Sequence, residues 1–305
     1  MSEGPVISII IVSYNTRDVL RDCLASIVRE ADVPYEVIVV DNASPDASVE
    51  MVEQEFPTFR AIRSGGNIGF SPANNIGLTE ATGSYLLLLN PDTLLLPQAL
   101  SSWLRDHEAQ HAGISGPFLQ NADGSHQRSA WKEPGLLSSL AELVFLHKVL
   151  QFGSYPERSF RTDFQPDFVS GAALLFHRSI YERIGGLDPQ MFWCEDVDLC
   201  VRVRKSGGTC YFLHRPRIIH LGGQSSKKNV DRVISNQLIS RIKFSRKHRN
   251  VLITLLLVMV IALHAFSRAL VFGFVGLIRT EPRARAYRYT LRKLGRYLFL
   301  ADRSI

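Results

Sequence analysis

Residues 6–12 read VISIIIV, a short apolar run of the kind that forms a buried parallel strand. Residues 16–30 follow as TRDVLRDCLASIVRE, in which apolar residues recur at helical spacing. Residues 36–40 read EVIVV and form a second buried apolar run. A strand, a helix and a second strand in this order predict a βαβ unit and therefore a parallel sheet.

The same alternation continues along the chain. It predicts a helix over 46–56, a strand over 59–63, a helix over 71–82, a strand over 84–89 and a helix over 97–110. Beyond residue 113 it weakens; we expect a strand and hairpin over 113–131, strands over 167–176 and 209–220, and helices over 136–151, 178–185 and 195–206. The predicted fold class is α/β, with a mainly parallel sheet flanked by helices.

Polar residues stand where three of the predicted strands end. They are Ser13-Tyr14-Asn15, Asp41-Asn42-Ala43-Ser44 and Asn90-Pro91-Asp92. In an open parallel sheet, ligands bind beyond the carboxyl ends of the strands. The three ends together therefore predict a ligand site along one edge of the sheet.

Residues 251–278 are apolar apart from an interruption at His264, Ser267 and Arg268. The stretch is long enough to cross a bilayer only if Arg268 lies near an interface or is shielded. Basic residues on both sides fit a segment in the membrane plane at least as well. Residues 284–300 interleave arginines with aromatic and aliphatic residues, as in an interfacial amphipathic helix. A buried helical hairpin or an oligomer contact is the alternative.

The net charge of +6 is confined to the C-terminus. Residues 279–305 hold eight lysines and arginines against Glu281 and Asp302, so the rest of the chain balances to zero. Because this basic tail adjoins an apolar segment, we expect a membrane surface and no nucleic acid. The four cysteines lack metal-site spacing and are expected to be reduced cytosolic thiols. The N-terminal residues are expected to form a strand and not a signal peptide.

Six segments between residues 6 and 226 carry a resemblance to a known family. They are IIIVSYN, VVDNAS, GGNIGF, LLLLNPDT, GGLDPQMFWCEDVDLCVRVRKSG and IIHLGGQS. Together they resemble the motifs of family 2 glycosyltransferases, in particular bacterial rhamnosyltransferases of O-antigen and cell-wall polysaccharide synthesis. The resemblance implies a GT-A-like domain over residues 1–226, with a nucleotide-binding half at 1–112 and an acceptor half at 113–226. A membrane-associating helical region is expected at 227–305.

The resemblance also implies a metal site. A divalent cation neutralises the charge that grows on a departing diphosphate. The family's acidic motif reads Asn90-Pro91-Asp92 here, so that Asp92 alone supplies a carboxylate, and His220 matches the histidine that completes the site in related enzymes. Mn²⁺ or Mg²⁺ is the expected cofactor. A helix-capping Asp92 and a structural His220 are the alternatives.

By the same resemblance, the strand ends bind the nucleotide. Asp41 matches the carboxylate that accepts a hydrogen bond from the pyrimidine N3–H, although an Asx turn at a strand end would also explain it. The residues expected to complete the nucleotide and sugar pocket are Ser13, Tyr14, Asn15, Asn42, Ser44, Gly66, Asn67 and Asn90. Gly66 and Asn67 belong to a glycine-rich loop, where the backbone can approach a ligand closely.

An inverting transfer needs one base to take the proton of the attacking hydroxyl. In the family's Glu-Asp motif the aspartate is this base, which is Asp196 here, with Glu195 as a second contact. Asp188 and Trp193 flank the motif and are expected to line the acceptor site. The alternative is that these acids only stabilise the first turn of a helix.

The function that the resemblance implies is inverting transfer of a sugar from a nucleotide-sugar donor to a polyprenyl-diphosphate-linked saccharide, in bacterial cell-surface polysaccharide synthesis. Rhamnose from dTDP-rhamnose is the first candidate, and the cytoplasmic face of the inner or plasma membrane is the expected place. Two other classes stay open. A sugar nucleotidylyltransferase would need a G-x-G-T-R loop where this chain reads SYNTRDV; a non-catalytic membrane adaptor on the same fold is the other.

Overall fold

The computed structural model describes residues 4–146, 152–222, 230–275 and 282–299. The chain divides into two compact units. The first comprises Met1–Lys132, Tyr155–Gln190 and Glu195–Ser225, and the second Glu133–Ser154, Met191–Cys194 and Ser226–Ile305. Two segments within the expected 1–226 domain thus group with the C-terminal helices, and the expected domain boundaries stay a prediction.

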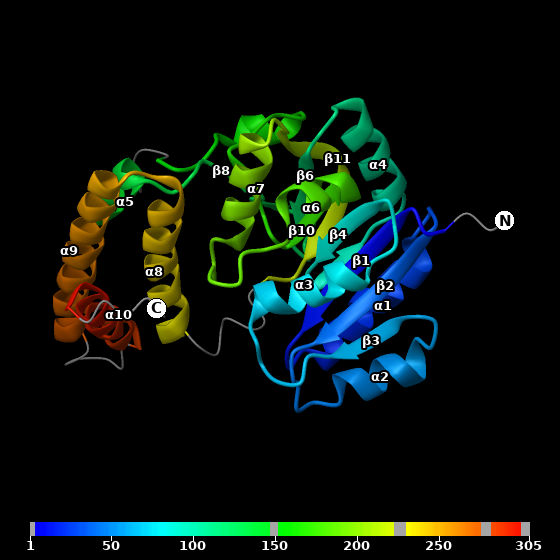
Figure 1. Cartoon of the computed structure of the whole chain (residues 1–305), viewed down its shortest axis with the longest axis horizontal. Helices are drawn as coiled ribbons and strands as arrows, with labels where there is room; N and C mark the ends of the chain where they lie inside the picture. Colours follow the sequence, from blue (N-terminus) through cyan, green and yellow to red (C-terminus); the bar gives the residue numbers. More distant parts are fainter. Residues whose placement is uncertain (1–3, 147–151, 223–229, 276–281, 300–305) are drawn as a thin grey trace. The chain divides into compact units, whose positions relative to one another are not determined.

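The first unit contains the strand–helix alternation. Its elements are β1 (Ile7–Ser13), α1 (Arg17–Glu30), β2 (Tyr35–Asp41), α2 (Ser48–Glu55), β3 (Arg60–Arg63), α3 (Phe70–Glu80), β4 (Tyr85–Leu89), β5 (Thr93–Leu95), α4 (Ala99–Ala109), β6 (Ile114–Gln120), β7 (His126–Gln127), β8 (Ala130–Trp131), the 3₁₀ helix η2 (Glu157–Arg161), β9 (Phe168–Val169), β10 (Ala173–His177), α6 (Arg178–Ile184), α7 (Glu195–Lys205) and β11 (Cys210–His220). All the strands and helices expected from β1 to α4 are present (Figure 1).

Nine of the described strands form one sheet in the order β3-β2-β1-β4-β10-β6-β11-β5, with β7 paired to β6. Strands β3, β2, β1 and β4 are mutually parallel, as expected. Beyond them β10 runs antiparallel to both β4 and β6, and β5 runs antiparallel to β11. The sequence did not predict β5, because its three residues are too few for a periodic pattern.

Both faces of this sheet are covered by helices, which is why its central strands are largely apolar on both faces. Along β1, Ile7, Ile9 and Ile11 pack in a core with α1, α2 and α4. The intervening Ile10 and Val12 pack in a second core with α3, α6 and α7. Helix α3 lies very close to the sheet, and a side chain at Gly77 would overlap Ile10.

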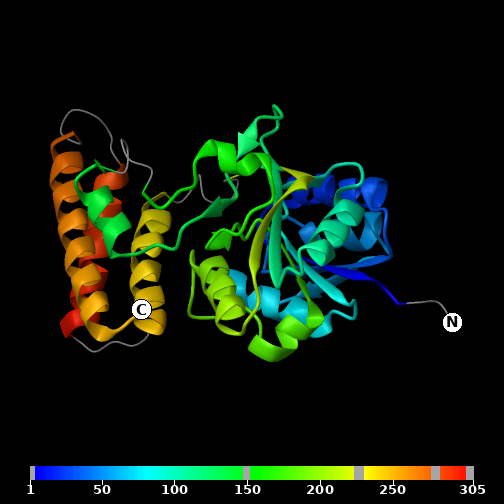
Figure 2. The ribbon, with the colours of Figure 1, turned by 90° about the horizontal axis from the view of Figure 1, so that it is seen from above.

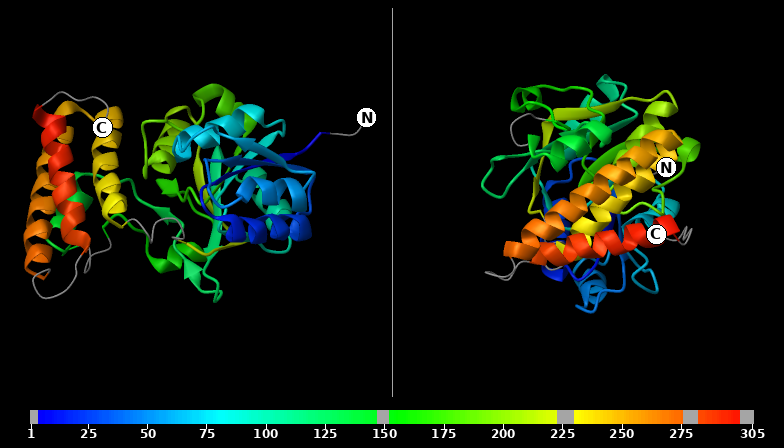
Figure 3. Two further views of the ribbon diagram at one scale, coloured as in Figure 1. Left: turned by 90° about the horizontal axis from the view of Figure 1, so that it is seen from below. Right: turned by 90° about the vertical axis from the view of Figure 1, so that its left-hand side faces the viewer.

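The second unit is helical. Its elements are α5 (Leu136–Leu143), α8 (Val230–His248), α9 (Val251–Val275) and α10 (Pro282–Phe299). Helices α8, α9 and α10 pack side by side (Figure 3), and α5 packs on α9 (Figure 2). The sequence did not predict α8, and it predicted a longer α5; residues 147–151 of that expected helix and 276–278 of the apolar segment lie outside the described residues.

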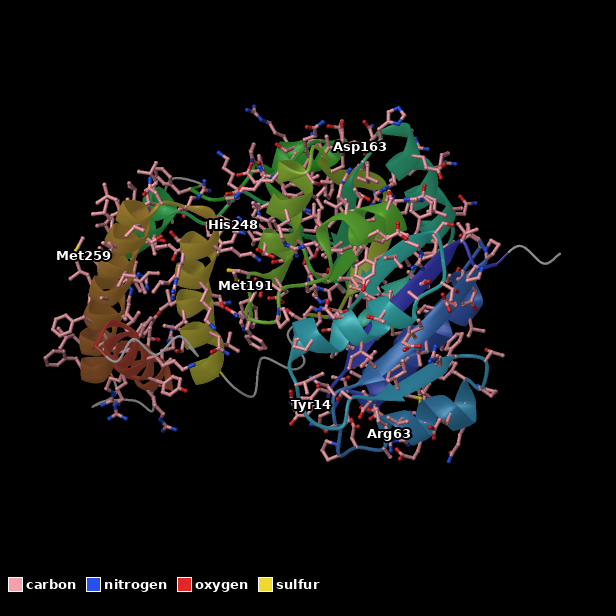
Figure 4. All side chains as sticks on the ribbon, in the orientation of Figure 1. Tyr14, Arg63, Asp163, Met191, His248 and Met259 are labelled. Atoms are coloured by element: carbon pink, nitrogen blue, oxygen red, sulfur yellow. The ribbon has the colours of Figure 1, made fainter. Side chains whose placement is uncertain are left out.

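Helix α9 has two apolar faces. Leu257, Val258 and Ile261 pack in a core with α8 and α10. A stripe on the opposite face is exposed; we call it the α9 stripe, and it consists of Leu252, Leu255, Met259, Leu263, Phe266, Leu270 and Phe274. Met259 points away from the unit (Figure 4). Within the described residues, one segment, Val251–Phe274, is long and apolar enough to cross a membrane, with a mean hydropathy of 2.2.

Candidate functional site

Asp92 and His220, which are distant in sequence, meet at one end of the sheet. His220 is the last residue of β11 and pairs with Thr93 of β5, the residue after Asp92. The Leu221 amide donates to the Asp92 carbonyl at 2.9 Å, which extends the pairing of β11 with β5 by one backbone hydrogen bond. As a result, His220 Nε2 lies 3.3 Å from Asp92 Oδ1, and both side chains are largely buried.

Gln127 on β7 orients the His220 ring. Its Oε1 atom lies 2.6 Å from His220 Nδ1, while its Nε2 donates to the His220 carbonyl at 3.1 Å and to Asn121 Oδ1 at 3.0 Å. Because both donor contacts use the amide nitrogen, the amide oxygen must accept from Nδ1–H. In the neutral ring, the Nε2 lone pair is then directed at the Asp92 carboxylate.

Asp196 lies in the first turn of α7 and is held by the backbone. Its Oδ2 accepts from the Gly171 amide at 3.0 Å, and its Oδ1 accepts from the Val197 amide at 2.8 Å. Desolvation opposes these two bonds and is the larger effect, so that burial raises the pKa of Asp196 to about 6. A carboxyl with a pKa near the working pH is well suited to act as a general base.

A short chain of contacts connects Asp196 to the end of β4. Gly171, which donates to Asp196, precedes Ala172, whose carbonyl accepts from the Asn90 amide at 2.9 Å. A side chain at position 171 would come within 3.3 Å of Asp196 Cβ, so a glycine lets the acid lie close to this backbone. Asn90 begins the motif that contains Asp92, and the structure therefore brings the predicted base and the predicted metal ligands to one end of the sheet.

The ends of β1 and β2 form a second group of predicted residues. Ser13 is in register with Asp41. The Asp41 Oδ2 atom accepts from the Ser44 amide at 3.0 Å, and the Ser44 hydroxyl accepts from the Asn15 amide at 3.0 Å. The buried Asp41 Oδ1 has no hydrogen-bond partner among the described residues. A buried acceptor without a donor costs about 1–3 kcal/mol, so a donor from a ligand, such as a nucleobase N–H, would stabilise this site.

Asn42 ties the glycine-rich loop to this group. Its Oδ1 accepts from the Ile68 amide at 2.9 Å, and its Nδ2 donates to Asn67 Oδ1 at 3.1 Å. Gly65 has a positive φ of 78°, and a side chain at Gly66 would meet open space. Asn42 therefore positions the loop, and direct contact of Asn42, Gly66 and Asn67 with a ligand stays a prediction.

Four more residues are predicted to belong to the site, and they are Tyr14, Glu195, Asp188 and Trp193. Tyr14 is exposed, and Glu195 opens α7 beside Asp196. Asp188 accepts from the Gln190 amide at 2.9 Å and so forms a local turn. Trp193 belongs to the second unit, where its ring contacts Phe192 edge-on. The part that Asp188 and Trp193 play in an acceptor site stays a prediction.

Comparison with known families shows to which family the chain belongs. The family described as Glycosyl transferase family 2 matches residues 8–185, which is more than half of the chain. The chain belongs to glycosyl transferase family 2. The resemblance seen in the motifs is thereby confirmed.

Relatives of this family 2 glycosyltransferase include rhamnosyltransferases. The chain is 27% identical over 253 residues to the N-acetylglucosaminyl-diphospho-decaprenol L-rhamnosyltransferase of Mycobacterium tuberculosis, covering 73% of this chain and 78% of the relative. It is 26% identical over 255 residues to rhamnosyltransferase WbbL of Escherichia coli K12, covering 80% and 94% of the two chains.

Solved structures confirm the GT-A-like fold. The mannosyltransferase PcManGT from Pyrobaculum calidifontis, solved with GDP-Man and Mn2+, aligns with a TM-score of 0.60 at 15% identity, covering 99% of this chain and 89% of that one. TarS 1-349 of S. aureus, solved with UDP-GlcNAc, aligns with a TM-score of 0.54 at 17% identity, covering 95% and 80%.

The donor set at Asp92 and His220 fits a divalent cation. In the neutral ring a nitrogen lone pair and a carboxylate oxygen face each other at 3.3 Å, and two acceptors at this distance need a cation or a proton between them. Within the described residues no group of three or more such ligands exists. Two protein ligands suit Mg²⁺ or Mn²⁺, since such ions are commonly held by few protein atoms plus substrate phosphates.

The Gln127 contact yields a test of this site. In Gln127→Ala, the His220 ring loses the acceptor that fixes its tautomer, and we expect Mn²⁺ affinity to fall by roughly 10–100-fold. The measurement is the Mn²⁺ concentration needed to stabilise the protein thermally in the presence of donor. Gln165→Ala is the matched control. Gln165 also donates a hydrogen bond to β11, the strand of His220, but its partner there is the Tyr211 hydroxyl. Equal Mn²⁺ dependence of the two variants would contradict the assignment.

Sequence reasoning missed Gln127, and it did not predict the backbone contacts of Asn75 and Arg202 that support the site. Gln127 lies in a two-residue strand with no recognisable pattern. Asn75 bonds both the amide and the carbonyl of Leu187 at 2.8 Å. Arg202 pairs with Asp198 at 2.8 Å, at the i,i+4 spacing typical of ion pairs within a helix, and it also donates to the carbonyls of residues 184 and 186. The last two fix the loop that leads to the acid cluster, and only a tertiary structure reveals such backbone contacts.

Proposed function

We propose that this family 2 glycosyltransferase transfers rhamnose from dTDP-rhamnose, with inversion, to a saccharide linked to polyprenyl diphosphate. The observation that carries the proposal is the meeting of Asp92 and His220 at the strand ends, with Asp196 anchored to the same backbone. The choice of sugar and acceptor is supported by the two rhamnosyltransferase relatives, one of which has a decaprenol-linked substrate in its name.

The residues divide the reaction between them. Asp92 and His220 hold Mn²⁺ or Mg²⁺, which when bound neutralises charge on the departing diphosphate. Asp41 accepts from the base, and the loop at 65–70 lies against the nucleotide. Asp196 takes the proton of the acceptor hydroxyl while that oxygen bonds to the anomeric carbon from the face opposite the breaking bond to the diphosphate oxygen. The nucleotide diphosphate leaves with the electrons of that bond.

The C-terminal unit is proposed to hold the enzyme at the cytoplasmic face of the membrane. The α9 stripe would enter the lipid, and the arginines of α10 would meet anionic headgroups. Helix α9 packs along α8 and α10, which are rich in lysine and arginine. Crossing the bilayer would bring those charges into hydrocarbon at about 2.5–3.5 kcal/mol each, which favours an orientation in the membrane plane.

Glutamate within the α9 stripe should weaken membrane binding. Burial of one leucine stabilises by about 1.5–3 kcal/mol, so Leu255→Glu and Leu263→Glu are each expected to lower the vesicle partition coefficient at least tenfold. Co-sedimentation with phosphatidylglycerol-containing vesicles measures this. Val28→Glu, at an exposed valine of α1, is the control. If all three variants bind vesicles equally, the stripe is not the membrane-binding face.

The catalytic proposal is tested with a panel of nucleotide sugars. With Mn²⁺ or Mg²⁺ present, dTDP-rhamnose should stabilise the protein thermally and release dTDP when a prenyl-diphosphate-linked N-acetylglucosamine is added. Release from another nucleotide sugar alone would replace the donor. Consumption of no nucleotide sugar would favour the non-catalytic adaptor. Two observations argue against a nucleotidylyltransferase. The chain matches family 2 of the glycosyl transferases, and the residues from the end of β1 read SYNTRDV where a G-x-G-T-R loop would be needed.

A further inference from the structure

The second unit contains a buried arginine, Arg268, that forms no ion pair with a carboxylate of the described residues. Arg268 lies on the inner face of α9 and is only 6% exposed. Its Nη2 donates to the carbonyls of Glu142 and Leu143, at 2.9 and 3.2 Å, and its guanidinium lies 3.6 Å from the centre of the Phe145 ring. The Glu142 carboxylate is already paired with Arg241 at 2.6 Å. Glu142 also attracts Arg268 electrostatically, so that among the described residues one carboxylate faces two arginines and a net positive charge is left.

Arg268 also has hydrogen-bond donors to spare. A guanidinium carries five N–H groups, and its Nε and Nη1 atoms have no acceptor among the described residues. The side chain lines a cavity of about 270 Å³, together with Arg241, Gln237, His264 and Tyr287. Pockets of roughly 300–1,000 Å³ bind drug-sized molecules, so this one is suited to a headgroup and not to an oligosaccharide.

An unpaired buried charge is strongly unfavourable, and buried charges in proteins are normally paired or bind a ligand. The Arg241–Glu142 pair is neutral, which leaves the cavity with the net positive charge of Arg268. An anion with several acceptor oxygens would balance this charge. Phosphate groups fit best, because the planar guanidinium of an arginine can donate two parallel hydrogen bonds to a phosphate. Arg268 lies on the face of α9 opposite the α9 stripe, but the cavity has apolar side chains of its own, Phe145, Ile234 and Leu238, on which the start of a lipid chain could pack.

We propose that this cavity binds the diphosphate group of a prenyl-linked substrate through Arg268, while the start of the prenyl chain packs on the apolar residues that line the same cavity. The choice of a prenyl diphosphate rests on the proposed function; the presence of an anion site does not. The cavity lies within the second unit and is built from α5, α8, α9 and α10. It would thus hold the acceptor lipid by residues that have no part in the chemistry.

The test is calorimetric titration of the full chain with geranyl diphosphate, with EDTA present so that no cation can recruit a diphosphate to Asp92. Geraniol and inorganic diphosphate are titrated in parallel, to separate the lipid from the anion. The variants are Arg268→Gln and Gln237→Glu, which gives the cavity its own anion without touching the carbonyl contacts of Arg268. Arg288→Gln, at an exposed arginine of α10, removes the same charge elsewhere in the unit.

We expect geranyl diphosphate to bind at least tenfold more tightly than either parallel ligand. Arg268→Gln and Gln237→Glu should each weaken its binding tenfold or more, and Arg288→Gln by less than twofold. Wild-type binding by a folded Gln237→Glu variant, or equal binding of geraniol, would overturn the anion site. Equal binding of inorganic diphosphate would overturn the lipid assignment. The two proposals can fail separately. If geranyl diphosphate binds in an Arg268-dependent way but the protein consumes no nucleotide sugar, the anion site is supported and the proposed function is wrong.

Discussion

Asp196→Asn is expected to lower kcat by roughly 10²–10⁴-fold, the usual contribution of a positioned general base. The substitution keeps the size of the side chain, and an amide oxygen can still accept from the Gly171 amide. It removes the carboxylate that we propose takes the acceptor proton. Donor affinity should change little, because Asp196 is assigned no contact with the nucleotide. The measurement is the initial rate of nucleotide diphosphate release at saturating acceptor.

The pH profile gives the same assignment a second readout. Asp196 acts as a base only when ionised, and its pKa is raised to about 6 by desolvation. The rate should therefore be constant above pH 7 and fall as the pH passes below 6, by roughly tenfold at pH 5. The residual activity of Asp196→Asn should lack this acid limb. Asp22→Asn, the same change at an exposed position on α1, should retain both rate and profile. Full turnover by Asp196→Asn would remove Asp196 as the base.

Asp92→Asn is expected to reduce kcat/KM by at least 10²–10³-fold. Loss of one preorganised group that stabilises transition-state charge typically raises the barrier by about 2.7–4 kcal/mol, and this variant also weakens the carboxylate that we propose as a ligand of the cation. The fold should tolerate it, because the backbone contact to Leu221 uses the Asp92 carbonyl and not the side chain. Rates are measured across a range of Mn²⁺ concentrations.

The cation dependence separates a ligand from a structural acid. An amide oxygen still coordinates weakly, so excess Mn²⁺ should restore part of the activity of Asp92→Asn. His220→Gln should shift the Mn²⁺ dependence in the same direction, whereas His214→Gln, six residues earlier on β11, should not. His214 bonds the Phe160 carbonyl and has no contact with Asp92. Identical Mn²⁺ curves for wild type, Asp92→Asn and His220→Gln would mean that the two side chains do not share a cation.

The local sequence accounts for most of the fold. The alternation from residue 6 to 110 predicts β1 to β4 and α1 to α4, because a strand covered on both faces is apolar throughout while a helix beside it shows a 3.6-residue period. Elements of two or three residues, such as β5 and β7, carry no period to detect. Helix α8 was missed because it is a mostly polar helix whose few core side chains pack on α9 and α10.

The candidate site also depends partly on local sequence and partly on tertiary structure. The sequence alone identifies the family and the residue types at the strand ends, because motif composition and spacing are local properties of the chain. Only the tertiary structure decided that Asp92 meets His220, since antiparallel pairing of β5 with β11 joins residues 128 positions apart. The same holds for the Gln127 contact, for the Gly171 amide on Asp196, and for the buried charge of Arg268. Hydrogen bonds and desolvation depend on what surrounds an atom in space, and a one-dimensional pattern does not contain those neighbours.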